Sequence, residues 1–152
     1  MYKLKDVFAK VSVIWNYTFP EGGGDTHYSV MKGSKADLVI RQGKEQNYQP
    51  ELFVEAVKGG DASYEKDLEG SMEKISSQYP GVALNKVRDG VWQVVIPSKY
   101  RVGHEAHFGQ VTEHFLDYLK EGALPVWEVP NMLAKYYVTT SALDMAKAKG
   151  KE

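Results

Sequence analysis

The chain has 152 residues, a formal net charge of −1 and 43% hydrophobic residues. We expect one α+β domain over residues 1–152, because this length is typical of a single domain with its own core. The near-neutral charge argues against nucleic-acid and membrane-surface partners, which normally require a basic excess. No apolar run approaches the roughly 20 residues of a membrane span, and the amino terminus lacks the apolar centre of a signal peptide. A soluble protein is therefore expected, with the cytoplasm as the favoured compartment.

Two features of the composition limit the kinds of site that the chain can form. The chain has no cysteine, which excludes disulfides, thiolate metal sites and a cysteine nucleophile. Aromatic residues make up 12% of the sequence, including 10 tyrosines and 3 tryptophans. Such side chains favour half-buried surfaces that are apolar at one end and polar at the other.

Alternating apolar and polar residues predict four strands in the first part of the chain. The first is the longest, and it places Val11, Val13, Trp15 and Tyr17 on one face. Pro20 and the glycines after it end this strand, so the first two strands would form a hairpin. The predicted strands are Val7–Phe19, His27–Lys32, Ala36–Arg41 and Glu51–Lys58.

The hydrophobic period lengthens to three or four residues after Gly59-Gly60-Asp61, which predicts a helix. Asp61 or Ser63 would cap its start, and Pro80-Gly81 would end it. Its predicted apolar stripe consists of Tyr64, Leu68, Met72, Ile75 and Tyr79.

The rest of the sequence predicts two short strands and two helices. The strands are Val82–Val87 and Val91–Ile96, and the helices run from about Glu105 to Lys120 and from about Asn131 to Lys147. The last helix would turn its apolar side inward, with Leu133, Tyr136, Tyr137, Thr140 and Leu143 on it. This order of elements predicts an α+β fold, a largely antiparallel open β-sheet with helices packed on one face.

The loop Gly22–Gly24 has the composition of a phosphate cradle, but its context differs. A dinucleotide fingerprint needs Gly-x-Gly-x-x-Gly between a strand and a helix. Here His27 stands at the third position and a strand follows. We interpret the loop as a hairpin connection. No other glycine-rich stretch matches this fingerprint, so we assign no cofactor-binding residue to this chain.

Asp25 and His27 follow this loop beside Trp15 and Tyr17 of the first predicted strand. Aromatic rings and an imidazole could line a pocket for a polar ligand. An Asx turn at Asp25 and a surface position for His27 explain the same pattern without a ligand.

A second cluster of histidines begins the first of the two last helices. The zincin motif is His-Glu-x-x-His, but His107 comes one residue too early after His104, so no metal site is predicted. Packing is the ordinary role of such residues, and general-base use of His107 or His114 is the open alternative. These histidines flank an apolar stripe of Phe108, Val111, Phe115 and Leu119.

The order of several short stretches resembles a known family. The hairpin is followed by the turn Gly33-Ser34-Lys35-Ala36, and His107 and Phe115 precede Gly122 and Pro125. These stretches are similar to the carboxy-terminal domain of the glucose–fructose oxidoreductase and inositol dehydrogenase (Gfo/Idh/MocA) family. Within that family, the branch that the chain resembles is the one described as "putative oxidoreductase C-terminal domain".

The resemblance implies a division of labour between two domains. Family members pair an upstream Rossmann domain, which holds NAD or NADP, with a second domain that shapes the substrate pocket and builds the oligomer. The chain would then bind a sugar-like molecule, carry no cofactor itself and form a homo-oligomer through its open sheet face. The family's catalytic lysine motif is not matched by Glu65-Lys66-Asp67 or Glu73-Lys74-Ile75. No catalytic residue is therefore assigned.

The leading hypothesis is the substrate-binding and oligomerisation domain of an NAD(P)-dependent oxidoreductase acting on a sugar or polyol, inactive alone. The alternatives are a stand-alone sugar-binding module and a small hydrolase or isomerase that uses His107 or His114. Self-association is expected through the strand face that carries Val11 and Val13. The expected substrate-binding residues are Trp15, Tyr17, Asp25, His27, His104 and His107.

Overall fold

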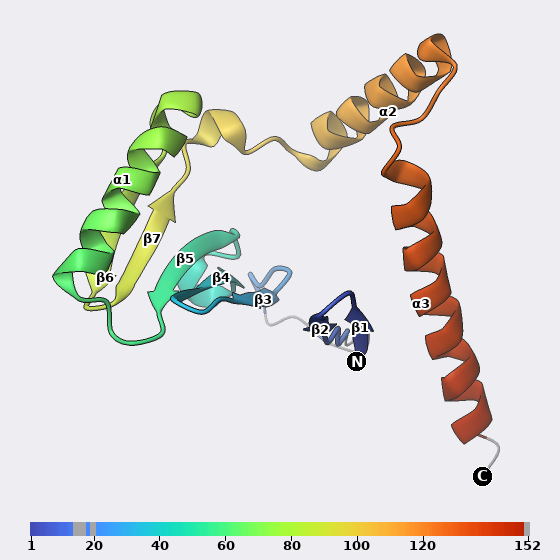
Figure 1. Ribbon diagram of the computed structural model, residues 1–152, viewed down its shortest axis with the longest axis horizontal. Coiled ribbons are helices and arrows are strands. Elements are labelled where there is room, and N and C mark those ends of the chain that lie inside the picture. Colours follow the sequence, from blue (N-terminus) through green and yellow to red (C-terminus); the bar gives the residue numbers. More distant parts are fainter. Residues whose placement is uncertain (14–17, 19–20, 151–152) are drawn as a thin grey trace. The chain divides into compact units, whose positions relative to one another are not determined.

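The computed structural model describes residues 1–13, 18 and 21–150 (Figure 1). The chain divides into two compact units. The sheet unit comprises residues 16–102, and the helical unit joins residues 1–15 with residues 103–152. The expectation of one domain over residues 1–152 stays a prediction.

The sheet unit contains a five-stranded antiparallel sheet in the order β3-β4-β5-β7-β6. Helix α1 (Ala62–Gln78) connects β5 to β6, which run in the same direction with β7 between them. Short 3-10 turns lie at Lys44–Gln46 and Ser98–Tyr100. The strands are β3 (His27–Lys32), β4 (Ala36–Gln42), β5 (Glu51–Ala56), β6 (Ala83–Arg88) and β7 (Val91–Val95). An open antiparallel sheet in an α+β fold is confirmed, and α1 is the helix of this unit that packs on it.

Strand β5 contributes to both sides of the sheet. Val54 packs with Met72 of α1 in one core cluster, which also contains Val82 and Val94. Phe53 faces the other side, in a cluster with Val39 and Val91. There the Arg41 guanidinium lies 4.9 Å from the centre of the Phe53 ring and pairs with Glu55. One face is therefore covered by a helix and the other partly by its own long side chains.

The turn at Gly90 approaches the Gly59 backbone closely. The Ala56 amide donates a 2.8 Å hydrogen bond to the Gly90 carbonyl. Gly90 has a φ of 71°, and a Cβ there would lie 2.8 Å from the Gly59 carbonyl oxygen. Only glycine fits this position without strain.

The helical unit holds a short hairpin and two long helices. Strand β1 (Tyr2–Leu4) pairs with β2 (Val7–Ala9), and α2 (His104–Glu121) ends at Gly122 in the left-handed region. Helix α3 runs over Glu128–Lys149, and neither α2 nor α3 has a buried residue. Among the described helices, none is long and apolar enough to cross a membrane.

The predicted long strand Val7–Phe19 is wrong over residues 10–13, because β2 ends at Ala9. Strand β2 pairs with β1, a strand that the alternation did not predict, and β3 pairs with β4. Lys5 adopts a φ of 51°, so the chain turns back at once and forms a local hairpin. Residues 14–17 and 19–20 of the predicted strand lie outside the described residues.

The helical unit by itself does not bury the predicted inward face of the last helix. Leu133 is 62% exposed and Tyr137 is 74% exposed. Periodicity identifies an apolar face but does not supply the surface that covers it. The helix also begins at Glu128 instead of Asn131, because Pro130 lies in the first turn, where no intrahelical donor is lost.

We expect Gly90→Ala to lower the free energy of unfolding by about 1–3 kcal/mol, because alanine would be held at a left-handed φ against the Gly59 carbonyl. Gly70→Ala is the matched control, since nothing lies within 4 Å of a Cβ at this mid-helix position. It should raise stability by about 0.5–1 kcal/mol. Urea denaturation of both variants measures the difference, and equal stabilities would contradict the close approach.

Candidate functional site

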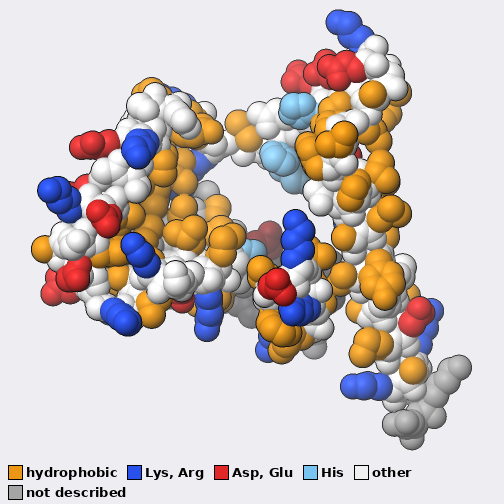
Figure 2. Space-filling view, in the orientation of Figure 1, with side chains coloured by type: hydrophobic (Ala, Val, Ile, Leu, Met, Phe, Trp, Pro, Cys, Tyr) orange, Lys and Arg blue, Asp and Glu red, His pale blue; other side chains and the backbone are white. Residues whose placement is uncertain are grey.

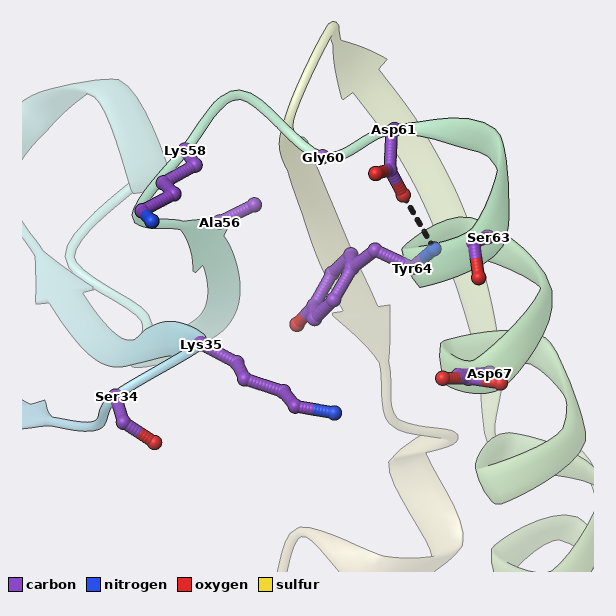
Figure 3. A pocket seen from close by; sticks show the side chains of 9 residues that line it. All are labelled: Ser34, Lys35, Ala56, Lys58, Gly60, Asp61, Ser63, Tyr64 and Asp67. Carbon is purple, nitrogen blue, oxygen red and sulfur yellow. Dashed lines mark hydrogen bonds between the residues drawn. The ribbon is translucent and has the colours of Figure 1, made fainter.

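A pocket of about 340 Å³ opens at the start of α1 in the sheet unit (Figure 3). Its walls come from the turn before β4, the segment after β5 and the first turns of α1. Lys35 reaches from the turn toward α1, and the Tyr64 hydroxyl points into the space between them. The lining residues are Ser34, Lys35, Ala56, Lys58, Gly60, Asp61, Ser63, Tyr64 and Asp67.

Strand register brings the two sides of the pocket together. Ala36 pairs with Ala56, so the turn before β4 lies beside the end of β5. The Val57 amide donates a 3.0 Å hydrogen bond to the Lys35 carbonyl and continues this pairing past the strand end. Lys35 and Lys58 therefore lie near the same end of the sheet, although 22 residues lie between them in the sequence.

Tyr64 is held from two directions. Its backbone amide donates a 2.8 Å hydrogen bond to Asp61 Oδ1, which caps α1 as the sequence predicted. Its ring lies 5.7 Å from the Trp92 ring, centre to centre, with the planes tilted by 47°. Burial raises the pKa of the Tyr64 hydroxyl above its ordinary value.

The charges in the pocket are balanced, with two lysines and two aspartates. Within the described residues, Lys35, Lys58 and Asp67 form no ion pair, whereas Asp61 is engaged as the helix cap. The pocket therefore presents hydrogen-bond donors and acceptors around a tyrosine ring. Such a lining can bind a small polar molecule that both donates and accepts hydrogen bonds.

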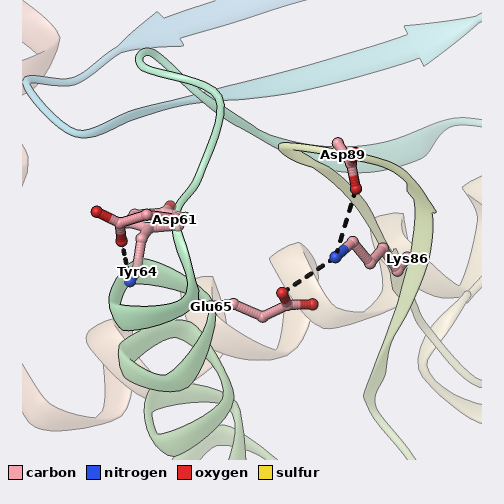
Figure 4. A network of polar contacts seen from close by, with 5 residues as sticks. All are labelled: Asp61, Tyr64, Glu65, Lys86 and Asp89. Carbon is pink, nitrogen blue, oxygen red and sulfur yellow. Dashed lines mark hydrogen bonds and ion pairs between the residues drawn. The ribbon is translucent and has the colours of Figure 1, made fainter.

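A polar network joins α1 to the β6–β7 hairpin next to this pocket (Figure 4). Lys86 Nζ lies 3.0 Å from Glu65 Oε2 and 3.7 Å from Asp89 Oδ1. It also lies 5.9 Å from the centre of the Trp92 ring. The hydrogen bond to Glu65 is the main cause that raises the pKa of Lys86, and the negative charges of Glu65 and Asp89 add to it.

The predicted strand Glu51–Lys58, the glycines after it and the predicted helix form a strand–glycine turn–helix unit in the structure. Strand β5 leads through Gly59-Gly60 into α1. The Asp61 carboxylate occupies the helix start, where a dinucleotide phosphate would have to bind. A Cβ at Gly60 would lie 2.8 Å from Trp92 Cη2, so this glycine serves side-chain packing. The residues of this turn do not fit a dinucleotide, and the loop at Gly22 leads into a strand, β3.

The predicted substrate-binding residues fall in both units. Asp25 and His27 are exposed in the sheet unit, at and just before the start of β3. His104 and His107 are exposed in the first turn of α2, in the helical unit, where the His104 ring lies 5.0 Å from the Phe108 ring. Trp15 and Tyr17 lie outside the described residues. Among the described residues, no group of three or more His, Asp or Glu side chains could hold a metal ion.

A comparison with models of protein families shows which family the chain belongs to. The model of the family described as "Putative oxidoreductase C terminal domain" matches residues 1–147. The chain belongs to this family. The resemblance inferred from the sequence is thereby confirmed for this branch.

A solved structure matches the C-terminal domain closely. It is the crystal structure of an oxidoreductase, described as putative, from Parabacteroides merdae ATCC 43184. The two share 87% sequence identity and a TM-score of 0.93 over 97% of this chain. The matched region is 34% of that protein's chain, so the C-terminal domain spans about a third of its length. Among curated proteins, none matches the sequence.

Sequence reasoning missed the pocket of the C-terminal domain. Asp61 and Tyr64 were identified, as a helix cap and as part of an apolar stripe, but not as walls of a pocket. Lys35 and Lys58 reach the pocket only because β4 pairs with β5, and the sequence does not reveal this pairing. The available signal was the break at Gly59-Gly60, which places polar residues at a strand-to-helix junction.

We expect the Lys86 network to stabilise the C-terminal domain in a pH-dependent way. The pKa of Lys86 is raised on folding, so its contribution is present below the ordinary lysine pKa of about 10.4 and is lost as pH rises through the higher folded value. Lys86→Gln should therefore lower Tm at pH 8, and the difference from the unsubstituted chain should shrink above about pH 10.4. Calorimetry at both pH values tests this. Lys66→Gln is the control, because Lys66 forms no ion pair within the described residues.

Proposed function

We propose that this C-terminal domain provides the substrate-binding and oligomerisation surfaces of an NAD(P)-dependent oxidoreductase that acts on a sugar or polyol. The chain is inactive by itself in this proposal. The observation that carries it is family membership, together with the 34% share that the chain takes of the related oxidoreductase. A family of C-terminal domains functions together with the part of the protein that precedes it.

The nucleotide belongs to that other part in this proposal. When bound, NAD or NADP would accept a hydride from the substrate. The glycine turns of this chain do not fit the phosphates of such a nucleotide. The contribution of this chain is to bind and orient the substrate. Asp25 can accept hydrogen bonds from hydroxyl groups, and each imidazole of His27, His104 and His107 can donate or accept one. Trp15 and Tyr17 would supply ring faces for the apolar side of a sugar.

The second candidate is a stand-alone sugar-binding module, and the pocket at the start of α1 favours it. A hydroxyl group both donates and accepts, so it suits a pocket where Lys35 and Lys58 donate and Asp67 accepts. The Tyr64 ring, held against Trp92, adds a flat apolar surface. In this alternative, the chain alone binds a sugar without any redox partner.

The first test is nucleotide binding. We expect no heat of binding when NAD, NADH or NADP is titrated into the isolated chain, because the Asp61 carboxylate occupies the start of α1. The full-length Parabacteroides merdae oxidoreductase is the positive control. Micromolar binding to the isolated chain would refute the division of labour. Sugar binding by the chain with no turnover in the longer protein would favour the stand-alone module.

The second test concerns self-association. Val11 and Val13 are 69% and 64% exposed, in a segment that forms no strand in the structure and that we propose to pack on a partner copy. Val13→Asp should shift the chain from oligomer to monomer in sedimentation velocity, because it would place a charge in an apolar contact. Ser12→Asp, at the neighbouring exposed position, should leave the mass unchanged. An unsubstituted chain that stays monomeric at high concentration contradicts this surface.

A further inference from the structure

The connection between β4 and β5 holds a tyrosine in a backbone conformation that tyrosine rarely adopts. Asn47 and Tyr48 have φ values of 51° and 57°, both in the left-handed region. Asparagine visits this region readily, because its short polar side chain can hydrogen-bond locally, whereas a bulky side chain there is an outlier. Strain of this kind persists only where the surroundings impose it, and it clusters at ligand sites. Tyr48 is therefore a candidate ligand-binding residue.

Contacts on its backbone and on its ring hold Tyr48 in this conformation. The Tyr48 amide donates a 2.8 Å hydrogen bond to the Gly43 carbonyl, and the Tyr48 carbonyl accepts a 3.1 Å hydrogen bond from Gln42 Nε2. The side chain lies against Gly24, where an added Cβ would be 3.0 Å from Tyr48 Cβ and Cγ. Tyr48 is partly buried, so its position is fixed while part of the ring remains accessible to a ligand.

Strand pairing places Tyr48 beside the proposed substrate residues of the sheet unit. His27 pairs with Gln42 at the end of the β3–β4 ladder, and Gln42 is the residue that donates to the Tyr48 carbonyl. Gly24, against which the Tyr48 side chain lies, immediately precedes Asp25. Asp25, His27 and Tyr48 therefore gather at one end of the sheet.

This end of the sheet is not the one that carries the pocket at the start of α1. That pocket is lined by Ser34 and Lys35, which follow the opposite end of the β3–β4 ladder, where Lys32 pairs with Asp37. A ligand at Tyr48 and a ligand in the pocket are consequently distinguishable by substitution.

The charges around Tyr48 suit an uncharged ligand. Lys44 and Glu45 of the neighbouring 3-10 turn carry opposite charges, and both are exposed. On the face of the sheet unit drawn in Figure 2, acidic and basic side chains are likewise interspersed. Interspersed charges do not concentrate ligands of one sign. A neutral sugar ring is favoured, because its apolar face can stack on Tyr48 while its hydroxyls bond to Asp25 and His27.

We propose that Tyr48 is a specificity-determining residue whose ring selects a cyclic sugar or cyclitol over an open-chain polyol. This inference rests on the proposed function and narrows its substrate class. An open-chain polyol offers the same hydroxyls to Asp25 and His27 but has no ring face to place on Tyr48. The strained backbone keeps the tyrosine ring in position before the ligand arrives, so binding has less ordering to impose.

The test uses a full-length chimera in which this chain replaces the matching third of the Parabacteroides merdae oxidoreductase. Matched probes are D-xylose against xylitol and myo-inositol against D-sorbitol, since each pair has the same number of carbons and differs in the ring. Calorimetry measures Kd for each probe, and reduction of NAD or NADP measures kcat and KM. We expect at least one ring to bind more tightly than its open-chain counterpart. Equal affinities within both pairs would overturn the proposal.

Substitutions at Tyr48 test whether its ring is the cause. Tyr48→Leu should weaken binding of the preferred ring by about five- to tenfold and leave open-chain affinity unchanged. Tyr48→Phe keeps the ring face and should keep the affinity. Tyr79→Leu, just after the end of α1, is the matched control and should have no effect. Equal effects at Tyr48 and Tyr79 would contradict the assignment.

Glycine and alanine variants separate ligand contact from packing. Tyr48→Gly releases the left-handed strain, so it should resist urea better than Tyr48→Leu while binding the ring as weakly. Gly24→Ala keeps the tyrosine but presses a Cβ against it, and ring affinity should fall several-fold. Gly70→Ala should leave affinity unchanged. Tyr48→Gly also serves if Tyr48→Leu fails to fold. Ring affinity that follows stability across these variants would mean that Tyr48 only packs, which overturns the proposal.

Failure of this inference and failure of the proposed function give different results. Ring binding that is lost in Tyr48→Leu, without reduction of NAD or NADP, would refute the oxidoreductase role and support the ring contact. Turnover that is equally efficient with rings and open-chain polyols would leave the proposed function intact and overturn selection by Tyr48. Ring binding that is lost in Tyr64→Leu but kept in Tyr48→Leu would place the ligand in the pocket at α1 and overturn this inference. Binding of none of the probes would overturn both.

Discussion

The pairing of β5 with both β4 and β7 is the constraint on which the sheet unit depends. Because β5 is central, its alternate residues serve opposite faces, with Val54 toward α1 and Phe53 toward the other side. The same pairing brings the turn at Lys35 to the end of β5 and so forms one wall of the pocket. A shift by one residue would exchange the two faces and remove both the core and the pocket.

The close contacts at the end of β5 extend this constraint into α1. Gly60 lies against Trp92, Gly90 lies against Gly59, and Asp61 caps the helix. These contacts fix the direction in which α1 leaves the sheet and hold Tyr64 at the pocket. A nucleotide-binding turn would need an open backbone here, whereas this turn is filled by a carboxylate and an indole.

The two units differ in how much of their apolar surface each buries within itself. In the sheet unit, α1 covers one face of the sheet and forms a core with it. Within the helical unit, neither α2 nor α3 has a buried residue. The predicted strands β3 and β4 and the Asp61 cap were correct because their signals are local. The long first strand was wrong over residues 10–13, because the chain turns back at Lys5 into a local hairpin and β2 ends at Ala9.

The sequence by itself determined the α+β class, most element boundaries and the helix cap, because alternation, capping and turn residues act over a few positions. The family came from the resemblance of several short stretches to a known domain. Only the tertiary structure decided the β5–β7 pairing, the local β1–β2 hairpin and the pocket between Lys35 and Tyr64. These depend on which strands pair and in what register, and neither is encoded in local periodicity.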